Sequence, residues 1–461
     1  MAYGLIHRLR VDSGIEAIVN VQANPGVTVT LIGSDKTTMF TAVADSTTGL
    51  AAITVNIPDT YTIGTDISAD SFAEGNTTSI DISESKTYTA QFIKLNKGYT
   101  ECGCTNAYKS NSLLVWWNGT KPTEYFSGWY CIDTDDNSEV TGEGTVYQIS
   151  SSISYRGFLK DVASGTTKTY KVGAYITING KNYHSAADTV TGTAKTISLN
   201  SFVKYTSSQT ITVPEGCHSI TAYCVGGGGA GGDAGYMGGP YCGLGGGGGG
   251  GGSVLNKTMT VLPGQNIIIT IGGGGSSNGA GGGTTTVAVN NQSIAAPGGR
   301  GGGGSYANGY NIYLWGGGSG GSGGGEGMAA NSKSGGWYLG GTGGSNGGKG
   351  GSVTYRGLAG SVNVAKRGGP GSGQNSTTQI NGITFAGGGG GGGAGSTGGN
   401  ATPGGAGGGG AGGNVHGASG TANTGGGGGG GGSNQERSNL GSSGWHGNGG
   451  SGVAFITFNA A

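Results

Sequence analysis

The chain has 461 residues, no net charge at neutral pH and 113 glycines, about one residue in four against a usual share of about 7%. The glycines occur in runs, and only nine prolines are present, which excludes collagen. No apolar run reaches the roughly 18 residues of a membrane-spanning helix, so membrane insertion is not expected. No cluster of Lys and Arg supports binding to nucleic acid.

Residues 1–94 are predicted to form an all-β domain. Short runs of alternating apolar and polar residues follow one another, the first two separated by the turn sequence Asn24-Pro25-Gly26, and no window of helical period competes with them. The pattern NPGVTVTLIG…TTMFTAVADSTTGLAAITVN resembles transthyretin-like modules of the carboxypeptidase regulatory type. The resemblance implies an Ig-like sandwich, which we expect to attach the protein to a larger assembly.

Residues 95–203 are predicted to form a second sandwich. The run SLLVWWNG indicates a buried strand that carries Trp116 and Trp117, and Asn179-Gly180 between two alternating runs indicates a hairpin. A tryptophan-bearing early strand and a late Tyr-x-Val-x-Ala-Tyr strand resemble those of Ig-like domains of the fibronectin type III kind.

Residues 204–461 differ sharply in composition, with 95 of the 113 glycines after residue 204. Strand patterns frame the glycine runs: Pro263-Gly264 and Asn290-Asn291 each predict a hairpin, and GVAFITF at 452–458 predicts a closing strand. The glycine runs are 226–229, 245–252, 272–275, 301–304, 387–393, 407–410 and 425–432.

Two interpretations of the glycine runs are open. An isolated run is a flexible linker, because glycine loses more backbone entropy on ordering than any other residue. Extended polyglycine helices with three residues per turn could instead associate side by side, since no Cβ keeps them apart. We favour this ordered lattice, because strands or aromatic residues bracket each run.

The order TITVPEG, TAYCVGGGGAGG, TVLPGQNIIITIGGGG, GGTTTV and GVAFITF over residues 209–458 resembles the glycine-rich domain of bacteriophage tail proteins and tail-fibre adhesins. The resemblance implies an all-β chain that ends in packed polyglycine II helices, whose loops recognise a receptor. It also implies a virion protein, assembled in the host cytoplasm, whose partners are other tail or baseplate proteins and a bacterial surface polysaccharide or outer protein.

Chemistry-bearing motifs are sparse. After residue 204 the only carboxylates are Glu215, Asp233, Glu326 and Glu436, too scattered for paired acid–base catalysis. Glycine-rich matches to nucleotide-binding motifs lack the required strand and helix. We therefore expect no catalytic residues, no cofactor and no enzyme activity.

Neither the cysteines nor the acidic turn at Asp133 predicts a metal-binding site. No CxxC pair or His at ligand spacing accompanies the six cysteines, so no metal site is expected. Either all six are reduced thiols, or Cys102 or Cys104 meets Cys131 from a neighbouring strand. Asp133-x-Asp135 begins like a calcium loop, but Gly144 stands where the bidentate Glu belongs, which favours an acidic turn.

Aromatic residues among Ser, Asn and Gly in the connectors have the composition of antibody loops. Either they contact a receptor, or they seal the edges of the lattice. The receptor-binding candidates are Tyr306, Tyr310, Tyr313, Trp315, Trp337, Tyr338, Tyr355, Trp445 and His446.

We expect a non-enzymatic virion protein of the tail tip or tail fibre that presents loops for host recognition. A purely structural virion component of the baseplate, tail or head decoration is the alternative, and an ice- or surface-binding protein is a further one. Homo-oligomerisation stays open, because no coiled-coil heptads impose a trimer.

Overall fold

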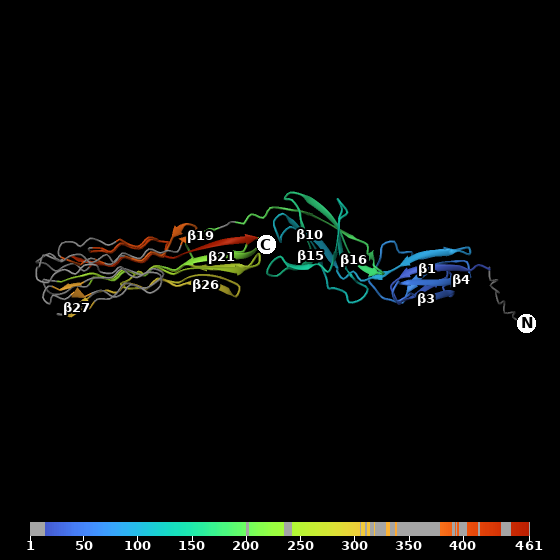
Figure 1. Ribbon diagram of the computed structural model, residues 1–461, viewed down its shortest axis with the longest axis horizontal. Helices are drawn as coiled ribbons and strands as arrows, with labels where there is room; N and C mark the ends of the chain where they lie inside the picture. The colour runs from blue at the N-terminus through green and yellow to red at the C-terminus, as the bar shows by residue number, and fades with distance from the viewer. Residues whose placement is uncertain are drawn as a thin grey trace, which may run out of the picture. The chain divides into compact units, whose positions relative to one another are not determined.

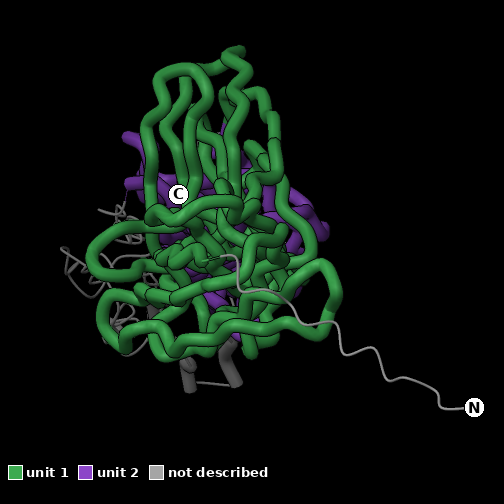
Figure 2. The backbone as a smooth tube through the Cα atoms, turned by 90° about the vertical axis from the view of Figure 1, so that its right-hand side faces the viewer, with its two compact units in different colours: residues 1–198 green, residues 199–461 purple. Residues whose placement is uncertain are grey.

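The computed structural model describes residues 14–199, 202–234, 242–304 and 379–460, the last with gaps at 390–391, 393, 396–402, 414 and 435–443, together with residue 318 and four short strands between 306 and 338. The described chain is all-β (Figure 1). It divides into two compact units, residues 1–198 and 199–461 (Figure 2). Within the described residues no helix is long and apolar enough to cross a bilayer.

The first sandwich of unit 1 has two sheets that enclose one apolar core. The core includes Val19, Leu31 and Tyr61, none of which is exposed to solvent. Apolar residues alternate along the strands, so one face of each sheet is buried. One sheet has the order β4 (Leu50–Val55), β1 (Ala17–Ala23), β8 (Thr87–Phe92), and the other β3 (Met39–Val43), β2 (Thr28–Ile32), β5 (Asp59–Thr65), β7 (Ser79–Ile82).

The second sandwich has its own core around Trp117 and Trp129, whose ring centroids lie 5.1 Å apart. The predicted tryptophan-bearing strand is confirmed as β11, and the Asn179-Gly180 hairpin joins β16 to β17. One sheet has the order β10 (Glu101–Thr105), β11 (Ser112–Asn118), β15 (Ser154–Asp161), β14 (Thr145–Gln148). The other has the order β13 (Glu139–Gly142), β12 (Gly128–Asp133), β16 (Thr167–Ile178), β17 (Lys181–His184), with β18 (Asp188–Thr193) also on β16.

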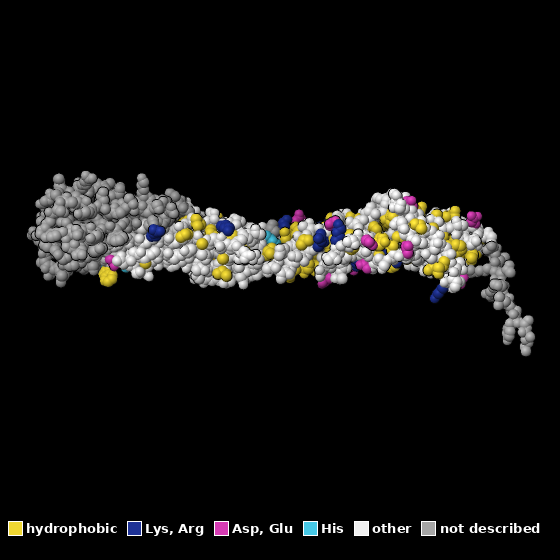
Figure 3. All heavy atoms as spheres, turned by 90° about the horizontal axis from the view of Figure 1, so that it is seen from below, with side chains coloured by type: hydrophobic (Ala, Val, Ile, Leu, Met, Phe, Trp, Pro, Cys, Tyr) yellow, Lys and Arg dark blue, Asp and Glu magenta, His cyan; other side chains and the backbone are white. Residues whose placement is uncertain are grey.

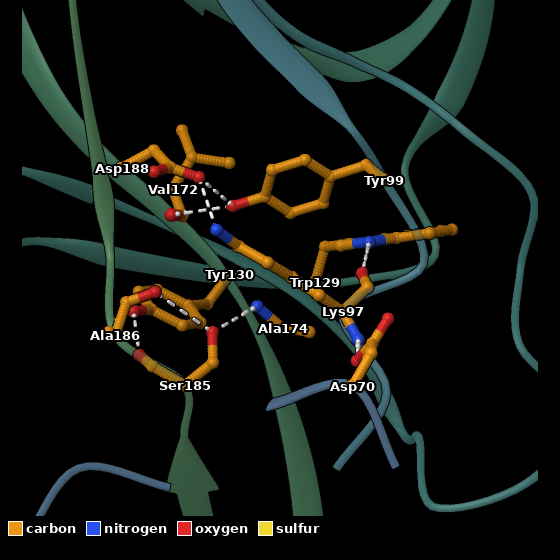
Figure 4. Close-up of polar contacts among 10 residues, drawn as sticks. All are labelled: Asp70, Lys97, Tyr99, Trp129, Tyr130, Val172, Ala174, Ser185, Ala186 and Asp188. Carbon is orange, nitrogen blue, oxygen red and sulfur yellow. Dashed lines mark hydrogen bonds and ion pairs between the residues drawn. The ribbon is translucent and has the colours of Figure 1, made fainter. Parts of the chain in front are cut away.

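Polar contacts gather around Lys97 at the junction of the two sandwiches of unit 1 (Figure 4). The Lys97 amide donates to the Asp70 carboxylate at 2.7 Å, and the Lys97 ammonium pairs with Asp188. The Tyr99 hydroxyl donates to Asp188 at 2.9 Å. Burial opposes ionisation of Asp188, but these hydrogen bonds from Lys97 and Tyr99 hold its pKa below the usual value. A small sheet of β6 (Ser71–Phe72) and β9 (Lys94–Leu95) lies at the same junction.

The acidic turn after β12 holds a lysine. The Lys168 ammonium lies 3.0 Å from Asp133 and 2.8 Å from Asp135, and the hydrogen bonds that it donates to both carboxylates raise the pKa of Lys168. The side chains that resembled the start of a calcium loop therefore form an ion-pair cluster.

The described thiols are free, so the pairing of Cys131 with Cys102 or Cys104 is wrong. Cys131 and Cys224 are fully buried, and this burial raises the pKa of each to about 12. At pH 8 only about one molecule in 10⁴ then carries either thiolate, which is the reactive form. We expect peptide mapping after iodoacetamide treatment of the native protein at pH 8 to find both unmodified. Urea should make both react, and labelling of either in the native protein would contradict the buried placement.

Unit 2 begins with a third two-sheet core, from which the glycine segments extend (Figure 1). One sheet has the order β19 (Val203–Tyr205), β35 (Val453–Ala460), β21 (Cys217–Val225), β23 (Val254–Thr260), and the other β20 (Gln209–Thr212), β24 (Asn266–Thr270), β25 (Thr285–Val289), β26 (Gln292–Ala296). The remaining strands are β22 (Cys242–Leu244), β27 (Tyr306–Asn308), β28 (Asn311–Tyr313), β29 (Ala329–Asn331), β30 (Trp337–Tyr338), β31 (Gln379–Ile380), β32 (Ile383–Thr384), β33 (Ala394–Gly395) and β34 (Ser433–Asn434).

One predicted hairpin of unit 2 is confirmed and the other is wrong. Asn290 and Asn291 do join β25 to β26, and Asn290 adopts a φ of 52°. The turn at Pro263-Gly264 exists, but the strands on either side, β23 and β24, lie in different sheets. The chain there crosses from one sheet of the core to the other.

Candidate functional site

Backbone hydrogen bonds join the described glycine segments to one another. Along 226–234, every third N–H donates to the same neighbouring segment, which runs antiparallel. Gly228, Gly231 and Ala234 donate to the carbonyls of Gly450, Gly447 and Gly444 at 2.8, 2.9 and 3.0 Å. The residues between them donate to two further segments: Gly229 and Gly232 to Gly250 and Gly247, and Gly227 and Ala230 to Gly283 and Ala280. Three successive N–H groups of this segment therefore point in three different directions, and each direction faces a different neighbouring segment.

Close packing of the segments explains the need for glycine. A Cβ at Gly249 would lie 2.0 Å from the Gly229 oxygen, and one at Gly428 would lie 1.9 Å from the Gly447 oxygen. Both distances are far inside van der Waals contact, and the obstacle is backbone, which cannot rotate away. Along these segments the absence of a side chain, rather than conformational freedom, is what the packing requires.

An aromatic cluster links the lattice to the strands. The rings of Phe202 and Phe455 stack with centroids 4.8 Å apart, and Phe385 meets Phe455 edge-on at 5.5 Å. Val225, at the end of β21, and Val453, at the start of β35, belong to the same buried cluster. The cluster thus fixes the positions from which two glycine segments leave the sheet.

Trp445 projects from this lattice with 62% of its surface exposed. Its backbone N–H donates to His416 Nδ1 at 3.3 Å, and its backbone carbonyl accepts from the Gly417 N–H at 2.9 Å. The neighbours Gly444 and Gly447 are buried, and a Cβ at either would lie 2.0 Å from a carbonyl oxygen. The backbone of Trp445 is therefore held on both sides while its indole faces solvent.

His446 points the other way, into a polar contact between distant segments. Its Nδ1 lies 2.6 Å from Asp233 Oδ1, and its backbone N–H donates to the same oxygen at 2.9 Å. The side chain is only 12% exposed. The Asp233 N–H donates in turn to Asn278 at 3.0 Å. The His446 ring is thus engaged in joining lattice segments.

The surface of unit 2 is poor in charge. In the space-filling view its described part is mostly white, which is backbone and uncharged polar side chains (Figure 3). Within the described residues, no group of three or more His, Cys, Asp or Glu side chains could hold a metal ion.

A sequence-family comparison decides what this domain is. The model of the glycine-rich domain matches residues 204–459, more than half of the chain. The chain belongs to the glycine-rich domain family. A search of curated proteins gave no match.

Solved structures add no further assignment. Two DUF3823 family proteins, from Parabacteroides merdae and Bacteroides ovatus, are 10% and 11% identical to this chain, each with a TM-score of 0.17 over 38% of this chain and 98% of theirs. A Bacteroides uniformis protein, provisionally described as carbohydrate binding, is 10% identical with a TM-score of 0.15 over 38% and 99%. At these TM-scores the likenesses carry no argument.

The other predicted receptor residues of the glycine-rich domain are placed only in part. Tyr306 and Tyr313 are opposite each other on β27 and β28, and Trp337 and Tyr338 form β30. Tyr310, Trp315 and Tyr355 lie outside the described residues. Whether these seven contact a receptor stays a prediction.

Sequence reasoning missed the residues that surround Trp445. His416, Ser419 and Asn448 are exposed beside it, and each is three residues from another member of the group along its own segment. A search with the three-residue period of a polyglycine helix would have found this spacing. The contact of Asp233 with His446 joins residues 213 positions apart and has no local signal.

Proposed function

We propose that this protein is a non-enzymatic virion component of a bacteriophage tail tip or tail fibre, and that its glycine-rich domain presents side chains that recognise a bacterial surface. Membership of the glycine-rich domain family supports this, together with the resemblance of residues 209–458 to phage tail proteins. The lattice segments are, in this proposal, polyglycine II helices, as their three-residue hydrogen-bond period indicates.

The exposed indole of Trp445 on a fixed backbone is the observation that carries recognition. A lattice built by backbone contacts has no mobile side chains to order on binding, so a ring that projects from it is already in place. Among the described residues, Trp445 is the largest apolar side chain that stays exposed, and tryptophan is enriched among the residues that dominate binding energy.

Two measurements test the proposal. Antibodies against the purified protein should label the distal tail of virions produced from the genome that carries the gene, as seen by immunogold electron microscopy. The labelled full-length protein should also bind the bacterium that these virions infect and slow their adsorption. Labelling of the virion without cell binding would favour the purely structural alternative, and no labelling would contradict the assignment to a virion.

A further inference from the structure

Two neighbouring lattice segments, 415–424 and 444–452, run parallel and place side chains on one face. The Gly417 N–H donates to the Trp445 carbonyl at 2.9 Å, and three residues on the Gly420 N–H donates to the Asn448 carbonyl at 2.8 Å. A three-residue step in both partners keeps the segments in register. With a rise of about 3.1 Å per residue, equivalent positions recur about every 9 Å.

Four exposed side chains of these segments form what we call the Trp445 strip: His416 and Ser419 on one segment, Trp445 and Asn448 on the other. Ala418, Thr421 and Ala422 of the first segment are exposed as well. Hydrogen bonds across the two segments pair the four side chains of the strip, because the backbone N–H of Trp445 donates to His416 Nδ1 and the backbone N–H of Asn448 donates to Ser419 Oγ, each at 3.3 Å. Gly444 and Gly447 on the same segment are buried. The strip is a two-by-two array of side chains, in which each pair is joined by a backbone-to-side-chain hydrogen bond across the two segments.

The chemistry of the strip is aromatic and polar without formal charge. His416 Nδ1 accepts a hydrogen bond only when it carries no proton, so the neutral ring has its proton on Nε2 and that atom is a donor. Asn448 and Ser419 supply further donors and acceptors. The carboxylate of Asp233 is engaged by the ring and backbone of His446, the residue next to Trp445.

These features match a sugar better than a protein partner. The C–H face of a pyranose ring is apolar and complements the negative face of an indole. Its hydroxyls both donate and accept, so they can satisfy an imidazole, an amide and a hydroxyl together. A stable protein interface needs about 800 Å² and about 20–30 residues from each side, whereas the strip has four side chains.

We propose that the Trp445 strip binds a neutral polysaccharide, with one sugar ring stacked on Trp445 and a neighbouring part of the chain hydrogen bonded to Asn448 and Ser419. This rests on the proposed function and names the class of ligand that it recognises. The absence of a cationic side chain in the strip is what selects a neutral chain over an acidic one.

The test uses the full-length protein on an array of immobilised neutral and acidic bacterial polysaccharides and, in parallel, on whole cells of a panel of bacteria. The variants are Trp445→Ala and Asn448→Ala. Ile268→Ala is the matched control, because Ile268 is an apolar residue of the same unit with 54% of its surface exposed. Unchanged melting of all three variants would show that they fold, as expected for exposed positions.

We expect the parent to bind at least one neutral polysaccharide, Trp445→Ala to weaken that binding at least about tenfold, Asn448→Ala to weaken it about threefold and Ile268→Ala to leave it unchanged. Cell binding that persists fully in Trp445→Ala, or binding of acidic polysaccharides alone, would overturn the proposal that the Trp445 strip binds a neutral polysaccharide. Either result would leave the proposed recognition of a bacterial surface intact. A parent that binds no cell and no polysaccharide would overturn both proposals.

Discussion

Replacing Gly249 with Ala is expected to unfold the glycine lattice while unit 1 stays folded. The Gly249 N–H donates to Gly428 and its carbonyl accepts from Gly389, both at 2.8 Å, and the new Cβ would lie 2.0 Å from the Gly229 oxygen. Relief of that collision must separate three segments and break buried backbone hydrogen bonds. Overpacking costs about 1–3 kcal/mol and each buried unsatisfied group about 1–3 more, so we expect a loss of about 3 kcal/mol or more.

Gly273→Ala is the matched control for this variant. A Cβ at Gly273 meets no atom within 4 Å, although Gly273 also belongs to a glycine run and its carbonyl accepts a hydrogen bond from Gly283. We expect its stability to stay within about 0.5 kcal/mol of the parent. Urea unfolding followed by hydrogen exchange, which reports each unit separately, is the measurement. Equal exchange protection in the two variants would show that the segments are not packed together.

Local turn chemistry made much of the β structure predictable. Asn179-Gly180 adopts φ values of 47° and 75°, which Asn and Gly tolerate better than other residues, so its hairpin could be seen in the sequence. Pro263-Gly264 was misleading because a turn fixes only the reversal of the chain. β23 pairs with β21 and β24 pairs with β20, and both of these partner strands precede β23 in the sequence.

The lattice was predictable in kind but not in arrangement. Runs without Cβ atoms indicate that segments can approach closely, yet identical residues carry no information on which run meets which. Gly229, for example, bonds to both Gly250 and Gly428, and nothing in either run singles out that partner. The arrangement of the glycine segments is set instead by the strands and by the cluster of Phe202, Phe385 and Phe455, where distinct side chains can specify which elements pack together.

The candidate site was predictable at one residue. Trp445 stands out as an aromatic among small residues, and the structure does leave it exposed. His446 looked equivalent, but a contact with Asp233 across the lattice turns its ring inward. The hydrogen-bond partners of these segments recur every third residue, so neighbours in sequence point in different directions and do not share a face.

Removal of residues 453–461 is expected to prevent unit 2 from folding. This segment contains β35, which lies between β19 and β21 in the centre of its sheet, and its Phe455 ring contacts both Phe202 and Phe385. Burial of a large apolar side chain contributes about 1.5–3 kcal/mol, and β35 buries four such side chains, Val453, Phe455, Ile456 and Phe458. The loss of about 6–12 kcal/mol is comparable to the whole stability of a domain.

Thr457→Ala tests whether the loss comes from the buried side of the strand. Thr457 is half-buried and opposite Thr221, so we expect a change of about 1 kcal/mol or less. Limited proteolysis should degrade the truncated chain after about residue 199 and leave unit 1 intact, because the core of unit 1 contains no residue from β35. Glycine segments that resist proteolysis in the truncated protein would mean that backbone hydrogen bonds alone hold the lattice, without the strands that anchor it.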